Sequence, residues 1–221
     1  FAKSGANDRV WNSFEKHCLA DPANFARYFT NHALDTICKA WLGPAYQMTA
    51  QVNRVNPGGA AQTAHRDYHL GFMSEEQMRA YPPSVHQLSP MLTLQGAIAH
   101  VDMPIEAGPT MYLPHSQKWP EGFIYYSRDE VQALFAERMV QLPLAKGDGA
   151  FFNPALLHGA GNNISSDIYR MGNLLQISSA MGRPMETVDR PAMTTALMPI
   201  LASGAMTGSD RKLLVEMVAQ G

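Results

Sequence analysis

The stretch VQLPLAKGDGAFFN, residues 140–153, contains two short apolar runs, 140–144 and 150–153, separated by the turn Lys146-Gly147-Asp148-Gly149. Short apolar runs bounded by Gly and Pro are typical of strands. The same pattern recurs in residues 47–55, 91–101, 111–113 and 169–178. About eight short strands with tight turns predict an antiparallel jelly roll. We therefore expect a mainly β fold, a cupin-like double-stranded β-helix, although a plain β-sandwich without a site also matches the pattern.

Helical patterns flank this central part of the chain. Asp21 followed by Pro22 predicts a helix start, and Gly43-Pro44 predicts an end. Residues 127–130 match a capping box, and a last helix is expected near Ser209. We expect a single domain with N-terminal helices in 1–43, a jelly-roll core in 44–180 and a helical tail in 181–221. The apolar positions at helical spacing in the first part are Val10, Trp11, Phe14, Cys18, Phe25, Tyr28, Phe29, Ala33, Ile37 and Trp41.

The composition excludes several classes of protein. With 221 residues, a net charge of −2 and 46% hydrophobic residues, the chain is long enough for one domain with its own core. It has neither the basic stripe typical of nucleic-acid binding nor an apolar run near the ~20 residues of a membrane span. Its two cysteines, Cys18 and Cys38, are too few for a disulfide framework, so we expect reduced thiols and a cytoplasmic location. The chain starts at Phe1, so we expect that its natural N-terminus lies upstream.

Three segments carry residues suited to catalysis. On an extended strand, residues i and i+2 point to the same side, so His65 and Asp67 would present an imidazole beside a carboxylate. His158 follows the apolar run 150–152, and Arg170 follows a short distance after His158. A lone His-x-Asp is a weak signal that arises easily by chance. The ordered set of all four residues is much more specific.

Two His and one carboxylate are the ligand set of non-haem Fe(II) sites. Three protein ligands leave three positions open, enough for a bidentate co-substrate and O₂. A keto-diacid co-substrate would need a cation for its far carboxylate, and Arg pairs carboxylates bidentately while keeping its charge. The alternative interpretation is a hydrogen-bonded His–Asp pair, an unrelated turn His and a surface Arg.

The chain resembles the phytanoyl-CoA dioxygenase family of Fe(II)/2-oxoglutarate oxygenases over residues 47–179. The stretches that carry the resemblance are 65–69, the strand pair 97–101 and 108–114, and 147–170. The resemblance implies that His65, Asp67 and His158 hold Fe(II) and that Arg170 binds 2-oxoglutarate. It further suggests Gln95 and Asn53 as co-substrate contacts, and Tyr68 and His69 as residues of the substrate mouth. O₂ would be the second co-substrate.

The sequence departs from the family pattern at several places. The family's Pro-Gly-Ser-His turn is Pro114-His115-Ser116-Gln117 here, and Ala160 stands where some members use a Ser to help hold 2-oxoglutarate. Ala97 replaces a Trp that is frequent in the family. At the metal, halogenating relatives replace the carboxylate with a small residue. Asp67 therefore favours hydroxylation or another oxidation over halogenation.

These observations predict a dioxygenase that hydroxylates an aliphatic C–H of a small molecule while decarboxylating 2-oxoglutarate to succinate. Two alternatives stay open: a cupin-like metalloenzyme of another chemistry, such as an isomerase or zinc hydrolase, and a catalytically silent binding module. The residues do not specify the substrate, nor do they separate hydroxylation from desaturation, epoxidation or cyclisation. No basic cluster adjoins the mouth, so an acyl-CoA substrate is not expected. The apolar N-terminal helices are compatible with a homodimer.

Overall fold

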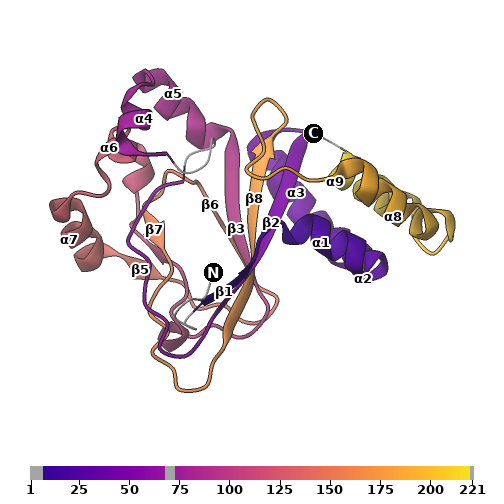
Figure 1. Ribbon diagram of the computed structural model, residues 1–221, viewed down its shortest axis with the longest axis horizontal. Coiled ribbons are helices and arrows are strands. Elements are labelled where there is room, and N and C mark those ends of the chain that lie inside the picture. The colour runs from indigo at the N-terminus through magenta and orange to yellow at the C-terminus, as the bar shows by residue number, and fades with distance from the viewer. Residues whose placement is uncertain (1–6, 68–72, 220–221) are drawn as a thin grey trace.

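The computed structural model describes residues 7–67 and 73–219. Two antiparallel sheets lie opposite each other, and helices cover the outer face of the larger one (Figure 1). The larger sheet has the strand order β1-β2-β8-β3-β6, and the smaller one the order β5-β4-β7. The bounds of these strands are β1 Asn7–Val10, β2 Tyr46–Val55, β3 Thr93–Ala99, β4 Met111–Tyr112, β5 Val140–Gln141, β6 Gly149–Phe152, β7 His158–Gly159 and β8 Arg170–Ser179.

The alternation of side chains in β2 explains why the larger sheet has two different faces. Tyr46, Met48 and Ala50 are buried under the helices, because every second residue of a strand points to the same side. Gln47, Thr49 and Gln51 point the other way, toward the smaller sheet. The inner face is therefore polar although it is buried, which is the condition for a binding site rather than a core.

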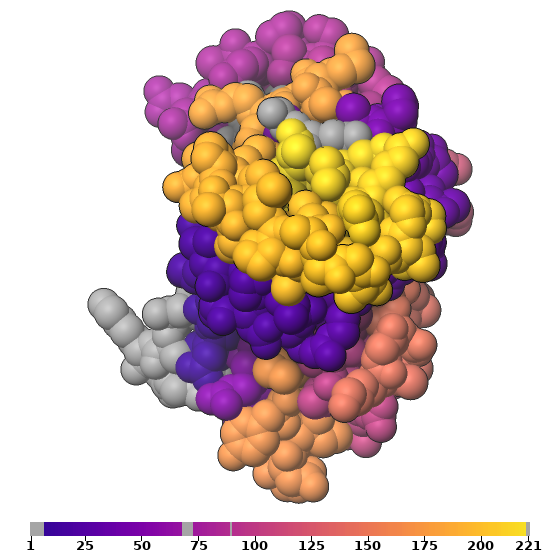
Figure 2. Space-filling model, turned by 90° about the vertical axis from the view of Figure 1, so that its right-hand side faces the viewer, coloured from indigo at the N-terminus to yellow at the C-terminus, as the bar shows by residue number. Residues whose placement is uncertain are grey.

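Five helices pack on the outer face of the larger sheet. Their apolar core includes Phe14, Phe25 and Phe29, whose rings lie with centroids 4.7 to 5.0 Å apart. Figure 2 shows the C-terminal helices in yellow directly against the N-terminal helices in indigo, so the two ends of the chain build one layer. The bounds of these helices are α1 Ser13–Ala20, α2 Pro22–Phe29, α3 His32–Leu42, α8 Arg190–Ala202 and α9 Gly208–Ala219.

The remaining short helices lie on the side of the smaller sheet (Figure 1). Met78 of α4, Phe123 of α6 and Ala155 form one small apolar cluster there, and Phe135 of α7 packs with Ala64 and Leu157 in another. These clusters hold the segments on both sides of β7. The bounds are α4 Glu75–Arg79, α5 Pro83–Leu88, α6 Gly122–Tyr125 and α7 Asp129–Arg138, with 3₁₀ turns η1 Ser89–Met91, η2 Ile105–Ala107 and η3 Ser116–Lys118.

The expectation of a mainly β fold is wrong, because the structure is 41% helix and 21% strand. The antiparallel sheets themselves form where the sequence predicts strands, but the strands are short. Helices meanwhile occupy a region inside the predicted jelly-roll core that gave no clear helical signal, residues 75–88. None of the described helices has the length and apolar composition needed to span a bilayer.

The N-terminal region differs from the helical prediction at its start. Val10 belongs to strand β1, and Trp11 lies in a turn before α1. Pairing of β1 with β2 overrides the weak helical spacing of these residues. Ile37 and Trp41 lie on the exposed side of α3, so they are not part of the core stripe.

The helix boundaries show which local signals are reliable. Asp21 caps α2 by accepting a hydrogen bond from the Asn24 backbone N–H, and Gly43 ends α3 with φ at 88°, as predicted. The predicted capping box at residues 127–130 is wrong, since α7 has Arg128 as its N-cap and no side-chain cap. The last helix is confirmed, with Leu213, Leu214, Met217 and Val218 buried.

Candidate metal centre

His65 and His158 are brought together by an antiparallel backbone bridge. The N–H of His65 donates to the carbonyl of His158 at 2.9 Å, and the N–H of His158 donates to the carbonyl of His65 at 3.0 Å. Asp67 follows in the same extended segment, where its N–H donates to the Pro154 carbonyl at 3.2 Å. These backbone hydrogen bonds hold the segment after β2 against Pro154 and His158, so that the three side chains lie close together.

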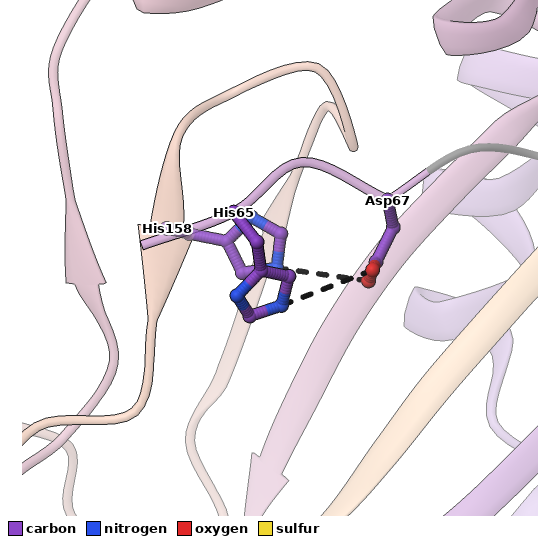
Figure 3. A group of neighbouring side chains, drawn as sticks. All are labelled: His65, Asp67 and His158. Atoms are coloured by element: carbon purple, nitrogen blue, oxygen red, sulfur yellow. Dashed lines mark ion pairs between the residues drawn. The ribbon is translucent and has the colours of Figure 1, made fainter. Parts of the chain in front are cut away.

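The three side chains converge on one point (Figure 3). His65 Nε2 lies 3.8 Å from Asp67 Oδ1, and His158 Nε2 lies 3.7 Å from Asp67 Oδ2. The three ligand atoms all lie within 4.8 Å of one another. Ligand atoms at about 2.1 Å from one ion would lie about 3 Å apart, so a small inward movement would complete the site.

The backbone fixes which nitrogen of each imidazole carries the proton. His65 Nδ1 lies 2.9 Å from the Thr63 carbonyl, and His158 Nδ1 lies 2.8 Å from the Leu156 carbonyl. A carbonyl oxygen can only accept, so each Nδ1 must be the N–H and donate. Both Nε2 atoms then carry a lone pair facing Asp67, which is the arrangement that metal-binding histidines require.

Asp67 is buried, and its surroundings favour the ionised form. The Gln95 side-chain amide donates to Asp67 Oδ2. Burial raises the pKa of Asp67, but His158 and His65 in their protonated forms, together with the Gln95 amide, outweigh it and lower the pKa to about 2. Burial and the neighbouring His158 lower the pKa of His65. A carboxylate anion beside a neutral imidazole is the state that binds a divalent metal.

Arg170 is the first residue of β8, and its buried guanidinium lines the same cavity as the three ligands. Its Nη1 donates over long distances, 3.5 Å to the Ala107 carbonyl and 3.4 Å to the Gly161 carbonyl. Within the described part of the chain it forms no ion pair. Burial lowers its pKa to about 10, so the group stays cationic at neutral pH. A buried cation without a counter-charge requires an anion for stability.

The other residues predicted for the site differ in their positions and contacts. Gln95 lies in the cavity wall and contacts Asp67 rather than open space, while its Oε1 has no hydrogen-bond partner among the described residues. Asn53 also lines the cavity, but its amide donates to the Asp8 carbonyl at 3.1 Å and is committed to β1. Tyr68 and His69 lie outside the described residues.

Arg66 is a positioning residue that the sequence did not reveal. It stands between two ligands but points away from them, and its guanidinium donates to the carbonyls of Trp119 and Ser116. It also lies 5.3 Å from the centre of the Phe123 ring. A Cβ on Gly122 would collide with this guanidinium and would force it to move away from its two carbonyl partners. These contacts fasten the His65–Asp67 segment to the loop after β4.

The departures from the family pattern are accommodated locally. His115 adopts a left-handed φ of 66° in the turn where the family has glycine. Ser116 Oγ accepts a hydrogen bond from the Leu157 N–H at 2.8 Å, which supports the residue preceding His158. At Ala160, the backbone N–H donates to Gln62 Oε1 at 3.0 Å. The ring of Phe152 packs against His158 with centroids 4.7 Å apart.

Comparisons with known proteins agree with this geometry. The family model for phytanoyl-CoA dioxygenase (PhyH) matches residues 2–172. The chain is 27% identical to dioxygenase cdmD of Talaromyces verruculosus over 147 residues, 66% of this chain and 43% of that protein. It spans about half the length of the curated relatives it matches.

Solved structures share the fold. The non-haem α-ketoglutarate-dependent carbocyclase SnoK from nogalamycin biosynthesis superposes with a TM-score of 0.60 at 20% identity, covering 86% of this chain and 70% of that one. The epimerase SnoN, solved in complex with Fe³⁺, α-ketoglutarate and nogalamycin RO, gives a TM-score of 0.57 at 19% identity, covering 82% and 68%. The cupin-like sheet arrangement expected from the sequence is thus confirmed.

Proposed function

Because the chain belongs to the phytanoyl-CoA dioxygenase (PhyH) family, we propose that it is an Fe(II)/2-oxoglutarate-dependent dioxygenase that hydroxylates an aliphatic C–H of a small molecule. Enzymes of this family use Fe(II), 2-oxoglutarate and O₂. The observation that carries the proposal is one cavity lined by His65, Asp67, His158 and the buried Arg170, which has no ion-pair partner among the described residues.

The donor set suits Fe(II). His65 and His158 would each supply an Nε2 lone pair, and Asp67 a carboxylate oxygen, which leaves half of an octahedron open. When bound there, iron with 2-oxoglutarate and O₂ supplies the oxidising chemistry. The chain's own contribution is to fix the two imidazole tautomers and to hold Asp67 ionised through Gln95.

Arg170 would supply the positive charge that recognises the co-substrate. Its guanidinium would pair with the far carboxylate of 2-oxoglutarate and so compensate a buried charge. The weak contacts to the Ala107 and Gly161 carbonyls leave donor capacity for this ligand. Gln95 Oε1, which is buried and has no partner in the described part of the chain, would accept a hydrogen bond from a water on the metal side of the cavity.

Apolar side chains form part of the remaining wall of the cavity. Phe152, Tyr112 and Leu174 line it, and the Phe152 ring screens one side of His158. Limited access of water protects reactive species from side reactions. Because halogenating relatives have a small residue in place of this carboxylate, Asp67 favours hydroxylation or another oxidation over halogenation. Small-molecule substrates are the class that a cavity of this kind admits.

Substrate-independent turnover tests the proposal. Wild-type protein supplied with Fe(II), ascorbate, O₂ and 2-oxoglutarate should form succinate slowly, and His158→Ala should abolish this. His32→Ala, which alters an exposed histidine paired with Asp210, is the matched control and should retain turnover. Succinate formation by His158→Ala at the wild-type rate would contradict the ligand assignment. Turnover with Zn(II) in place of Fe(II), without O₂, would instead support a hydrolase or isomerase.

A further inference from the structure

The cavity that holds the metal ligands extends along the inner face of strand β8. Arg170 and Gln176 both line it, and they share that face because every second residue of a strand points to the same side. Six residues of extended strand separate their backbones by about 20 Å. In the proposed function Arg170 binds the far carboxylate of 2-oxoglutarate. Gln176 is too distant to bind the same carboxylate, so it lines a different part of the cavity.

Gln176 is the cross-strand neighbour of Gln95. The two residues pair directly between β8 and β3, so their Cβ atoms lie about 5 Å apart on the inner face. The Gln95 amide in turn donates to Asp67 Oδ2. Gln176 is thus one side chain removed from a proposed metal ligand. A molecule held by Gln176 would have the rest of its structure close to the metal.

Gln176 differs from the other side-chain amides that line the cavity, because its amide has no partner. Its backbone carbonyl accepts a hydrogen bond from Thr49 Oγ1 at 2.8 Å, but its side chain forms none with any residue that the structure describes. The other cavity amides each form a hydrogen bond within the protein; they are Gln51, Asn53, Gln62 and Gln95. Both the N–H groups and the carbonyl oxygen of the Gln176 amide are therefore available to a ligand.

Buried oxygens without a hydrogen-bond partner lie on the same face beside Gln176. One of them is Gln95 Oε1, which lines the cavity. The next cross-strand row adds three more: Gln47 Oε1, Ser178 Oγ and Thr93 Oγ1. None of the four has a partner among the described residues. A buried polar atom that stays unpaired costs free energy, so this concentration favours a bound polar molecule next to Gln176.

The part of the wall around Gln176 is neutral. Its cross-strand row in the described strands consists of Thr49, Gln176, Gln95 and Phe152. The carboxylate that touches this row, Asp67, is committed to the metal in the proposed function. An ionised ligand group held beside Gln176 would lose its hydration without gaining a counter-charge. The row is therefore suited to a neutral group that forms hydrogen bonds.

We propose that Gln176, together with Gln95 Oε1, binds a carboxamide group of the substrate, so that the natural substrate is a neutral amide. The inference rests on the proposed function, since it assigns Arg170 to 2-oxoglutarate and leaves Gln176 for the second organic molecule. A carboxamide has two N–H donors and one carbonyl acceptor. The two N–H groups would donate to Gln95 Oε1 and Gln176 Oε1, and the carbonyl would accept from Gln176 Nε2.

The number of donors distinguishes a carboxamide from other neutral groups. An alcohol has a single O–H, so it can donate to only one of the two amide oxygens, and an ester has no donor at all. The carboxamide would replace the water that Gln95 Oε1 accepts from in the empty cavity. It would leave the Gln95 amide on Asp67 unchanged.

Benzamide serves as the probe, and benzyl alcohol and methyl benzoate are its neutral counterparts with one donor and with none. Each is titrated calorimetrically into anaerobic protein, both without additions and with saturating Fe(II) and 2-oxoglutarate. We expect benzamide to bind wild type in both states, about tenfold more tightly than methyl benzoate and more tightly than benzyl alcohol. Gln176→Met, which keeps the length of the side chain but not its hydrogen bonds, should weaken benzamide binding about tenfold.

Stability and metal affinity separate binding from a structural role. The Gln176 amide forms no hydrogen bond within the described protein, so Gln176→Met should unfold in urea and bind Fe(II) like wild type. Gln176→Glu, which has the same shape but exchanges the N–H donor for an acceptor, should also weaken benzamide binding and replaces Gln176→Met where that variant does not fold. Gln87→Met changes an exposed glutamine of α5; it is the matched control and should bind benzamide like wild type.

The outcomes distinguish the two proposals. Equal affinities of wild type and Gln176→Met for benzamide, or a loss of stability parallel to the loss of binding, would overturn the role of Gln176. Equal binding of benzyl alcohol or methyl benzoate would overturn the carboxamide assignment. Loss of benzamide binding on saturation with 2-oxoglutarate would overturn the proposal too, by placing the probe in the co-substrate site. Absence of Fe(II)-dependent 2-oxoglutarate binding, with Gln176-dependent benzamide binding intact, would instead overturn the proposed function and leave an amide-binding site.

Discussion

His65 and His158, which are far apart in the sequence, exchange two backbone hydrogen bonds of 2.9 and 3.0 Å, and their rings lie with centroids 4.6 Å apart. The metal-facing nitrogens are therefore set by strand pairing and not by flexible loops. Each ring is oriented again by a carbonyl two residues before it. A centre assembled in this way is pre-organised before any metal arrives, which lowers the cost of binding.

Gln95 should influence metal affinity although it is not a ligand. Its amide donates to Asp67 Oδ2, so Gln95→Leu removes a contact that orients the carboxylate. Loss of such a partner typically costs 10- to 100-fold, and we expect about tenfold weaker Fe(II) binding by anaerobic titration. Gln176→Leu, on the strand position facing Gln95, should bind Fe(II) like wild type. Unchanged affinity in Gln95→Leu would show that Asp67 is held by other contacts.

A side chain at position 122 should destabilise the protein. A Cβ there meets the guanidinium of Arg66, which is itself held by the Trp119 and Ser116 carbonyls. Gly122→Ala is expected to lower the free energy of unfolding by about 1–3 kcal/mol in urea titrations. The matched control is Gly208→Ala, where an added Cβ meets no atom within 4 Å and stability should be maintained or slightly raised. Equal stability of both variants would contradict the tight packing around Arg66.

The two cysteines should be unreactive in the folded protein. Burial, with a smaller effect of Asp35, raises the pKa of Cys38 to about 12, and burial with Glu15 raises that of Cys18 to about 11. Disulfide reagents at pH 8 should therefore modify neither thiol until denaturant is added. Rapid modification of native protein would contradict their burial.

The same shifts give a direction for alkaline stability. A thiol whose pKa is raised on folding keeps its proton better in the folded state, so stability falls as pH rises from about 9 toward 12. Cys38→Ala should show a smaller loss of unfolding free energy over this range than wild type. A steeper loss in the variant would contradict the assigned direction.

The sequence predicts the long central strands and the candidate metal ligands of this molecule better than its edge strand and short helices. Strands at 46–55, 93–99 and 170–179 have clear apolar or alternating patterns, and the ligand types are chemically distinctive. The structure brings His65, Asp67, His158 and Arg170 into one cavity, as the ordered motif suggests. These features are local or depend on residue identity, so a single sequence can reveal them.

Other features depend on tertiary contacts that no local pattern encodes. Strand β1 has only the residues Asn-Asp-Arg-Val, so its sequence alone predicts neither an edge strand nor an arginine that lines the cavity. Gln95 lies on a strand, as predicted. Its hydrogen bond to Asp67, however, forms because two segments that are distant in the sequence approach each other. The helical content was underestimated because α4 and α5 are short, have weak periodicity and gain their stability from packing.

The central claim is that one cavity holds Fe(II) on His65, Asp67 and His158, and 2-oxoglutarate on Arg170. Anaerobic titration with Fe(II) and 2-oxoglutarate, followed by the weak visible charge-transfer band of the chelate, tests both parts together. We predict a band in wild type, and a band in Arg170→Ala that needs about tenfold more 2-oxoglutarate or greater. No band in well-folded wild-type protein, or equal 2-oxoglutarate requirements in the two proteins, would contradict the claim.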